Sequence, residues 1–120
     1  MQNQAIQRFH VGARMSEMAV YNRTVYLAGQ VTSDGNLDIA GQTSNVLTQI
    51  DTLLAEAGTD KSHILMCQIY LSDLGNFSAM NQVWEAWVAK GHTPPRATVQ
   101  ASLAKPEWLI EIVVTAAQKA

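Results

Sequence analysis

The sequence predicts an α+β fold in which one mixed β-sheet carries two helices on one face. Three observations predict it: several short segments are rich in strand-forming residues, two segments follow a helical period, and each helical segment leads into a further strand. Strand-helix-strand crossovers have one hand, so both helices are expected on the same face of the sheet. The other face is left open. At 120 residues the chain is expected to form a single domain, residues 1–120.

The first half of the chain is expected to form three strands and a long helix. Three short segments are rich in strand-forming residues: 8–11, 16–21 and 24–31. Asn22-Arg23 is expected to form a tight turn into the third of them, and a Ser-Asp-Gly-Asn loop follows it. From Ile39 the apolar residues recur with a helical period, and Gly58 is expected to end that helix.

The second half adds a buried strand, a second helix and two final strands. Residues 64–71 form a nearly continuous apolar segment, which is typical of a central strand. Asn76 is expected to cap the start of the second helix, and Gly91 to end it. Two last segments alternate polar and apolar residues: 96–103 and 109–116. The short Lys-Pro-Glu turn between them predicts that they pair as a hairpin.

Arg96 and Glu111 are the charged residues within the strands of this predicted hairpin. If Leu103 pairs with Trp108 across the turn, Arg96 and Glu111 lie on the same face of the sheet. The opposite face of the hairpin is almost wholly apolar and is expected to belong to the core. A sheet face that carries arginine, threonine, glutamine and glutamate is either solvated or lines a site.

Arg96 follows Pro94-Pro95, which stiffen the approach and fix where the strand begins. A guanidinium group is planar, permanently charged and suited to bidentate binding of a carboxylate. Arg96 is therefore a candidate for binding a carboxylate substrate. The alternative is a surface arginine or an ion pair with Glu111.

Glu111 lies between Ile110 and Ile112 in a strand that is otherwise apolar. An unpaired carboxylate there would be costly, so Glu111 must be paired, hydrogen-bonded or exposed in a cavity. In a cavity, a carboxylate can polarise a water molecule and take its proton. The alternative is a core ion pair with Arg96.

Composition argues against several classes of partner and location. The net charge is −2 and the eight Lys and Arg residues are spread thinly, so neither nucleic acid nor a membrane surface is an expected partner. Neither a signal peptide nor a segment of membrane-spanning length is visible, and a single cysteine fits a reducing cytosol. We therefore expect a cytoplasmic protein.

The remaining titratable residues predict no metal site. Cys67 lies in the apolar segment 64–71 and is expected to be a core residue rather than a nucleophile. His10, His63 and His92 lack the spacing of metal ligands. His92 precedes Arg96 in a loop, where it is either a pocket-rim residue or a plain loop histidine.

The chain resembles the RidA/YjgF family, small trimeric proteins that hydrolyse reactive imino acids. The family signature is matched by three stretches: Pro95-Arg96-Ala97-Thr98-Val99, Leu103 and Ile110-Glu111-Ile112. Two further stretches match the end of its third strand and its second helix: Ala28-Gly29-Gln30, and Asn76-Phe77 with Asn81. The resemblance covers roughly residues 14–117. Within the family, the chain is most similar to the YoaB-like branch, at three places: Ala13-Arg14-Met15-Ser16, Gly91-His92 and Val99-Gln100-Ala101.

The resemblance implies a chorismate-mutase-like architecture, in which three sheets pack into a homotrimeric barrel. It also implies that Arg96 binds the substrate carboxylate, that Glu111 positions the water that attacks the imine carbon, and that Asn81 faces the pocket. Gly29 would let a ligand approach the backbone, or it would mark a β-bulge, and Asn81 could instead face solvent. No cofactor is expected, because an imine is already electrophilic and only water, orientation and anion binding are required.

Three positions depart from the family pattern. Met15 stands where characterised members carry tyrosine, Ala28 replaces a serine, and Thr98 replaces a cysteine two residues after the arginine. Thr98 can still donate a hydrogen bond into the pocket. These changes bear on substrate size and efficiency, while the arginine and the glutamate are kept.

Two functions from different classes follow from these residues. The first is an enzyme that hydrolyses 2-imino acids or enamines, such as iminopyruvate and iminobutyrate, to 2-keto acids and ammonia. The alternative is a trimeric module that binds a small carboxylate without turnover, which the changes at Met15 and Ala28 favour. A ribonuclease would need a basic patch and base-stacking aromatic residues, which the sequence lacks.

Overall fold

The computed structural model describes residues 5–120 and contains one six-stranded sheet and two α-helices. The strands are β1 (Gln7–Val11), β2 (Ser16–Tyr21), β3 (Thr24–Leu27), β4 (Ile64–Leu71), β5 (Arg96–Gln100) and β6 (Ile110–Ala117). The helices are α1 (Ile39–Glu56) and α2 (Phe77–Trp87), with short 3₁₀ turns η1 (Lys61–His63) and η2 (Leu74–Asn76). The strand order is β1-β2-β3-β6-β4-β5. All neighbours pair antiparallel except β4 and β5, which are parallel.

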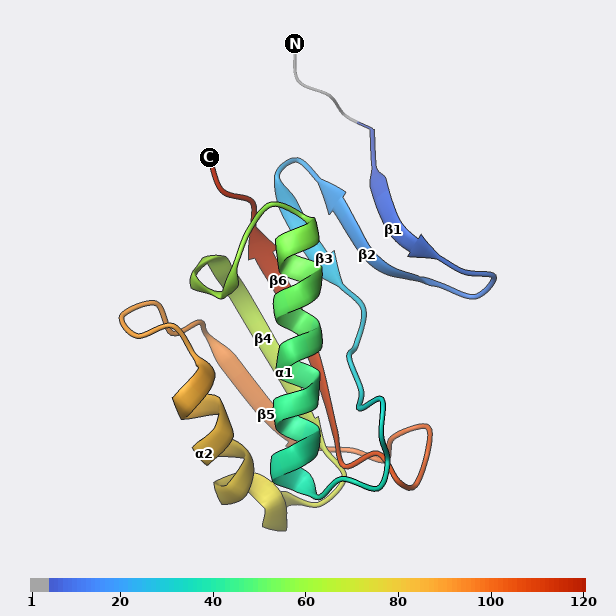
Figure 1. Ribbon diagram of the computed structural model, residues 1–120, viewed down its shortest axis with the longest axis vertical. Helices are drawn as coiled ribbons and strands as arrows, with labels where there is room; N and C mark the ends of the chain where they lie inside the picture. Colours follow the sequence, from blue (N-terminus) through green and yellow to red (C-terminus); the bar gives the residue numbers. More distant parts are fainter. Residues whose placement is uncertain (1–4) are drawn as a thin grey trace.

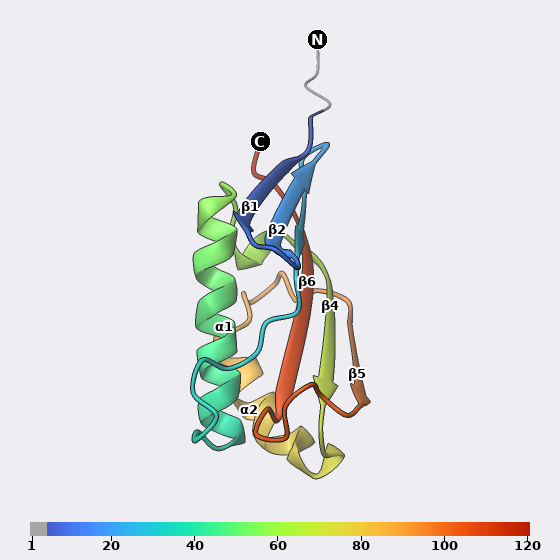
Figure 2. The same ribbon diagram turned by 90° about the vertical axis from the view of Figure 1, so that its right-hand side faces the viewer.

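The predicted α+β class is confirmed, because both helices cover one face of a single mixed sheet (Figures 1 and 2). The core lies between that face and the helices. The inward side chains of the sheet are fully or almost fully buried, as are those of α1 and α2: Met18, Val25, Leu47, Ile50, Leu54, Ile69, Leu71, Met80, Ile110 and Ile112. Cys67 belongs to this core, as expected, and burial raises the pKa of its thiol to about 12. None of the helices within residues 5–120 is long and apolar enough to cross a membrane.

Both boundaries of α1 have local causes. The Asp38 side chain accepts a hydrogen bond from the Gly41 amide at 2.8 Å and so caps the start of α1. After α1, Gly58 adopts φ +77°, a left-handed conformation that glycine adopts without strain, so it ends the helix as expected. Asn76 precedes α2, but its side chain makes no capping hydrogen bond.

The predicted hairpin of the last two strands is wrong. Strands β5 and β6 are not neighbours, because β4 lies between them and pairs with both. The crossover through α2 brings β5 alongside β4 in parallel, at the edge of the sheet. The chain then passes the end of β4 and inserts β6 between β4 and β3, which leaves the short Lys-Pro-Glu turn in a longer loop (Figure 1).

The prediction that Arg96 and Glu111 share a face is therefore also wrong. Arg96 lies beside Cys67, which faces the helices, whereas Glu111 lies beside Tyr70, which faces away from them. Val99, expected in the core, is instead on the open face and 45% exposed. The inward and outward faces of β6 are as predicted, but those of β5 are reversed.

Gln42 ties the first turn of α1 to the loop between β5 and β6. Its side chain is fully buried, and its amide nitrogen donates to the carbonyl oxygens of Leu37 and Glu107 at 3.1 and 2.9 Å. Its side-chain oxygen accepts from the Leu109 amide at 2.9 Å. One side chain thus satisfies three backbone groups, one just before α1 and two just before β6, the strand that carries Glu111.

We predict that Gln42→Leu lowers the free energy of unfolding by about 2–4 kcal/mol, because three backbone groups lose their partner while the side-chain volume is nearly kept. Urea unfolding at a fixed protein concentration measures this. Ser44→Ala, an exposed change on the same helix, should stay within about 0.5 kcal/mol of the original chain. Equal stability of both variants would contradict the anchoring role of Gln42.

Candidate functional site

Arg96 lies at the start of β5, where its guanidinium packs against α2. The guanidinium carbon is 5.2 Å from the centroid of the Trp84 ring, within the range of a cation–π contact. Trp84 is itself buried and packs against Trp87. The arginine head group is therefore held on a rigid aromatic surface rather than free in solvent.

Arg96 lines a cavity of about 530 Å³ between α2 and the loop that precedes β5. The other lining residues are Asn81, Trp84, Glu85, Val88, Lys90, Gly91 and Thr93. Asn81, the second candidate on α2, thus lies in the same cavity as Arg96. His92 is not among the lining residues. The cavity has two cations and one carboxylate in its wall, which suits an anionic ligand.

Thr98 shares the helix-facing side of β5 with Arg96, two residues further on. It does not line the Arg96 cavity. Its hydroxyl oxygen is buried and has no hydrogen-bond partner within residues 5–120. A buried hydroxyl without a partner is uncommon, and it leaves Thr98 with a donor to spare beside the arginine.

Glu111 lines a different cavity, of about 510 Å³, at the junction of β2, β3 and β6. The remaining lining residues are Met15, Ser16, Glu17, Ala28, Gly29, Gln30, Val31, Gln49 and Trp108. Met15, which is 51% exposed, stands at this cavity. The wall of the Glu111 cavity has two carboxylates, those of Glu17 and Glu111, and no arginine or lysine.

Gly29 makes room for the Glu111 carboxylate. A Cβ atom on Gly29 would lie only 2.1 Å from Oε2 of Glu111, so any other residue would displace the carboxylate. Close approach to the backbone does occur at Gly29, as the sequence suggested, but the approaching group is Glu111 itself. Glu111 makes no ion pair or side-chain hydrogen bond within residues 5–120, and the alternative of a core pair with Arg96 is wrong because the two residues lie on opposite faces.

The structure thus divides the candidate residues into two groups within one chain. Arg96, Asn81 and Thr98 lie on the side of α2, and Glu111, Gly29 and Met15 lie in the second cavity. Sequence reasoning missed Glu17 and Gln30 as lining residues of the second cavity. Their signal was present, because Glu17 is a charged residue within a strand and Gln30 follows Gly29 directly.

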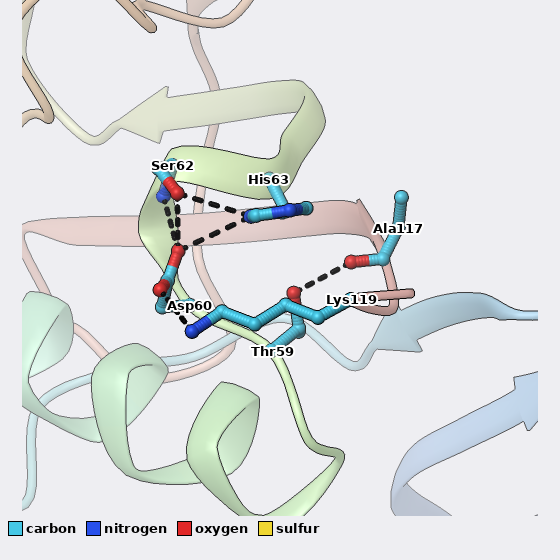
Figure 3. Close-up of polar contacts among 6 residues, drawn as sticks. All are labelled: Thr59, Asp60, Ser62, His63, Ala117 and Lys119. Carbon is cyan, nitrogen blue, oxygen red and sulfur yellow. Dashed lines mark hydrogen bonds and ion pairs between the residues drawn. The ribbon is translucent and has the colours of Figure 1, made fainter.

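Another polar cluster contains Asp60, Ser62, His63 and Lys119 (Figure 3). Asp60 accepts from the backbone amide and the hydroxyl of Ser62, and it pairs with Lys119 at 2.8 Å. These contacts hold the pKa of the Asp60 carboxyl well below its usual range, with Lys119 the largest cause. A hydrolytic triad needs histidine between serine and carboxylate. Here the Ser62 hydroxyl donates directly to Asp60, and His63 directs the same ring nitrogen, Nδ1, at both groups, at 3.0 and 3.3 Å, so the cluster caps η1 and fastens the C-terminal segment.

Metal ligation finds no support in the described part of the chain. Residues 5–120 contain no group of three or more His, Cys, Asp or Glu side chains arranged to hold a metal ion. His10 instead contacts both carboxylate oxygens of Glu56, at 2.8 and 3.0 Å. That contact raises the pKa of His10.

Comparisons with known proteins give the same fold. A solved structure of a member of the YjgF protein family from Neisseria meningitidis superposes with a TM-score of 0.96 and 46% identity, covering 99% of both chains. The RutC family protein YoaB of Escherichia coli is 44% identical over 112 residues, which is 93% of this chain and 97% of that protein. The 3-aminoacrylate deaminase RutC of Acinetobacter baylyi is 35% identical over 98 residues, 77% of each chain.

The family model described as Endoribonuclease L-PSP matches residues 5–118, nearly the whole of the chain. The resemblance seen in the arginine and glutamate strands is confirmed by this match, by the YoaB similarity and by the YjgF-type structure. The chain belongs to the RidA/YjgF family, whose matching model is named Endoribonuclease L-PSP.

Proposed function

We propose that the protein hydrolyses 2-imino acids to 2-keto acids and ammonia, at sites formed where two copies of the chain meet in a homotrimer. The observation that carries the proposal is Glu111: a carboxylate without an ion pair, seated in a cavity against a glycine that leaves room for it. Such a carboxylate is available to a water molecule and to a ligand. The relative named 3-aminoacrylate deaminase RutC supports deamination as the type of reaction.

Two features of the chain favour a site shared between copies. Arg96 and Glu111 face opposite sides of the sheet, so one chain alone does not bring them together. The Arg96 cavity has an excess of cations in its wall and the Glu111 cavity has only carboxylates, so the cavity of one copy complements that of the next. Contacts of this head-to-tail kind close into rings, and the proposed ring has three members.

The open face of the sheet supports the same assembly. It exposes apolar side chains on three strands: Tyr26 at 50%, Met66 at 41% and Val99 at 45%. A sheet face with this many exposed apolar groups is typical of a surface that another chain covers. Packing three such faces around an axis would bury them and bring neighbouring cavities together.

The chemistry needs few groups. Arg96 binds the carboxylate of the substrate through its guanidinium, with Asn81 beside it. Glu111 of the neighbouring copy takes a proton from water as the water oxygen bonds to the imine carbon. Glu111 gives this proton to the imine nitrogen, which completes the carbinolamine. Glu111 then takes the hydroxyl proton and passes it to the nitrogen, so that the carbonyl forms as the C–N bond breaks and ammonia leaves. One water is consumed, and no electrons are exchanged with an outside reagent.

A binding module without turnover is the second candidate, because Met15 and Ala28 bring no hydroxyl group to the Glu111 cavity. It would use the same Arg96 contact with a carboxylate. The two candidates differ only in whether Glu111 is used for chemistry, and variants at these two residues separate them.

Arg96→Ala is expected to weaken binding of pyruvate by at least about tenfold, because a charge-assisted bidentate contact contributes on the order of 1.5–3 kcal/mol. Calorimetric titration measures this. Arg8→Ala removes the same charge from an exposed position outside both cavities and should bind pyruvate as the original chain does. Equal pyruvate affinities of all three proteins would show that Arg96 does not bind the carboxylate.

Glu111→Gln is expected to leave pyruvate binding nearly intact and to lower the rate of iminopyruvate hydrolysis on the order of 10²-fold or more, because the shape is kept and the base is lost. Imines generated in situ by an amino acid oxidase, followed by their decay, give the rate. If Glu111→Gln abolished binding as thoroughly as Arg96→Ala, Glu111 would be a structural group. If neither variant changed imine decay, the binding module would stand in place of the enzyme.

A further inference from the structure

Glu17 is a second carboxylate in the wall of the Glu111 cavity. It comes from β2, whereas Glu111 comes from β6, so the two acidic groups reach the same space from different strands. Glu17 forms no ion pair with a lysine or arginine within residues 5–120. Its negative charge is therefore not neutralised by a direct partner there.

The Gln30 amide holds Glu17 in place. Gln30 is only 6% exposed, and its side-chain nitrogen donates to Oε1 of Glu17 at 3.0 Å and to the Ala28 carbonyl at 3.1 Å. Both acceptors lack a proton to donate, so the amide cannot be turned the other way without facing oxygen against oxygen. The Gln30 backbone in turn pairs with Ile112 in both directions, next to Glu111.

The nearby histidine does not use Glu17 as its partner. His10 directs its Nε2 atom at the two oxygens of Glu56 on α1, at 2.8 and 3.0 Å. Glu17 is close enough to influence His10 but forms no hydrogen bond with it. One Glu17 oxygen is thus fixed by Gln30, and Glu17 lines both the Glu111 cavity and a neighbouring one that contains His10, neither of which has a lysine or arginine in its wall.

We infer that Glu17 binds the cationic nitrogen of the ligand, so that the site selects small zwitterions with a carboxylate at one end and a protonated imine or ammonium group at the other. This inference rests on the proposed function, which places the carboxylate on Arg96 of the neighbouring copy. The combined site would then have a cationic end, which faces the carboxylate of the ligand, and an end with two carboxylates, which faces its cationic nitrogen.

Glu17 would favour the protonated imine, which is more electrophilic at carbon than the neutral imine. Hydrolysis of that form consumes one water and yields a keto acid and an ammonium ion, so atoms and charge balance. Glu111 takes the proton of the attacking water, and that proton reaches the nitrogen before the C–N bond breaks. Glu17 acts as a specificity residue here, because it contacts the nitrogen and accepts no proton.

The test compares two ligands of the same carbon skeleton, pyruvate and alanine, of which only alanine carries a cationic nitrogen. Glu17→Gln should weaken alanine binding by about tenfold or more and change pyruvate binding by less than about twofold, because a single charge-assisted contact is lost. The new amide can still accept from Gln30, so the fold is kept. Glu17→Asp keeps the charge and should retain most of the preference.

Glu56→Gln is the matched control, because it removes one negative charge from a neighbouring residue outside the Glu111 cavity. It should leave the ratio of the two affinities unchanged. Equal loss of both ligands in Glu17→Gln, or no loss of alanine, would overturn the inference. Arg96-dependent binding of pyruvate without binding of alanine would overturn it and leave the proposed function intact, whereas binding of neither ligand would overturn both.

Discussion

Strand β6 lies between β3 and β4, and this position determines where the charged groups of the molecule face. From that slot, one side of β6 packs its isoleucines and valine against the helices, and the other side presents Glu111 on the open face. Because β6 occupies the place beside β4, β5 lies at the edge of the sheet, where Arg96 packs against α2. A chain with β5 and β6 paired directly would have put the two charges on one face, where they would neutralise each other.

Arg96 and Glu111 lie on opposite faces, and each is held by a different set of neighbouring residues. Trp84 lies under the Arg96 guanidinium, and Gly29 leaves the space that the Glu111 carboxylate fills. The buried Gln42 side chain holds the β5–β6 loop before Glu111, and the Gln30 backbone pairs with that of Ile112 after it. Charged groups held without mutual neutralisation are typical of sites that wait for a ligand or a partner.

Much of the fold could be predicted from local patterns. The two helices, their end at Gly58 and the burial of Cys67 follow from periodicity and from apolar segments, which depend on neighbours in sequence. The strand order could not be obtained this way, because the position of β6 in the sheet depends on two crossovers rather than on the turn that precedes the strand. The faces of β5 do not follow from alternation, because this edge strand has no fully buried residue on either side: Thr98 on the helix side is half-buried, and Val99 on the open side is exposed.

The candidate site, too, could be predicted only in part from the sequence. Arg96 and Glu111 were found from their chemistry and from the family resemblance, but the contact of Glu111 with Gly29 and the role of Gln30 join distant parts of the chain. No local pattern encodes such contacts. Glu17 could have been noticed as a charged residue in a strand, yet only the cavity places it beside Glu111.

The central claim is that a working site takes Arg96 from one copy and Glu111 from another. The most direct measurement co-expresses Arg96→Ala and Glu111→Gln chains with different affinity tags and purifies the assemblies that carry both. In a ring of three such chains one interface joins an intact Arg96 to an intact Glu111, so the mixed assemblies should hydrolyse iminopyruvate at about a third of the original rate. Mixed assemblies no more active than the separate variants would contradict a shared site.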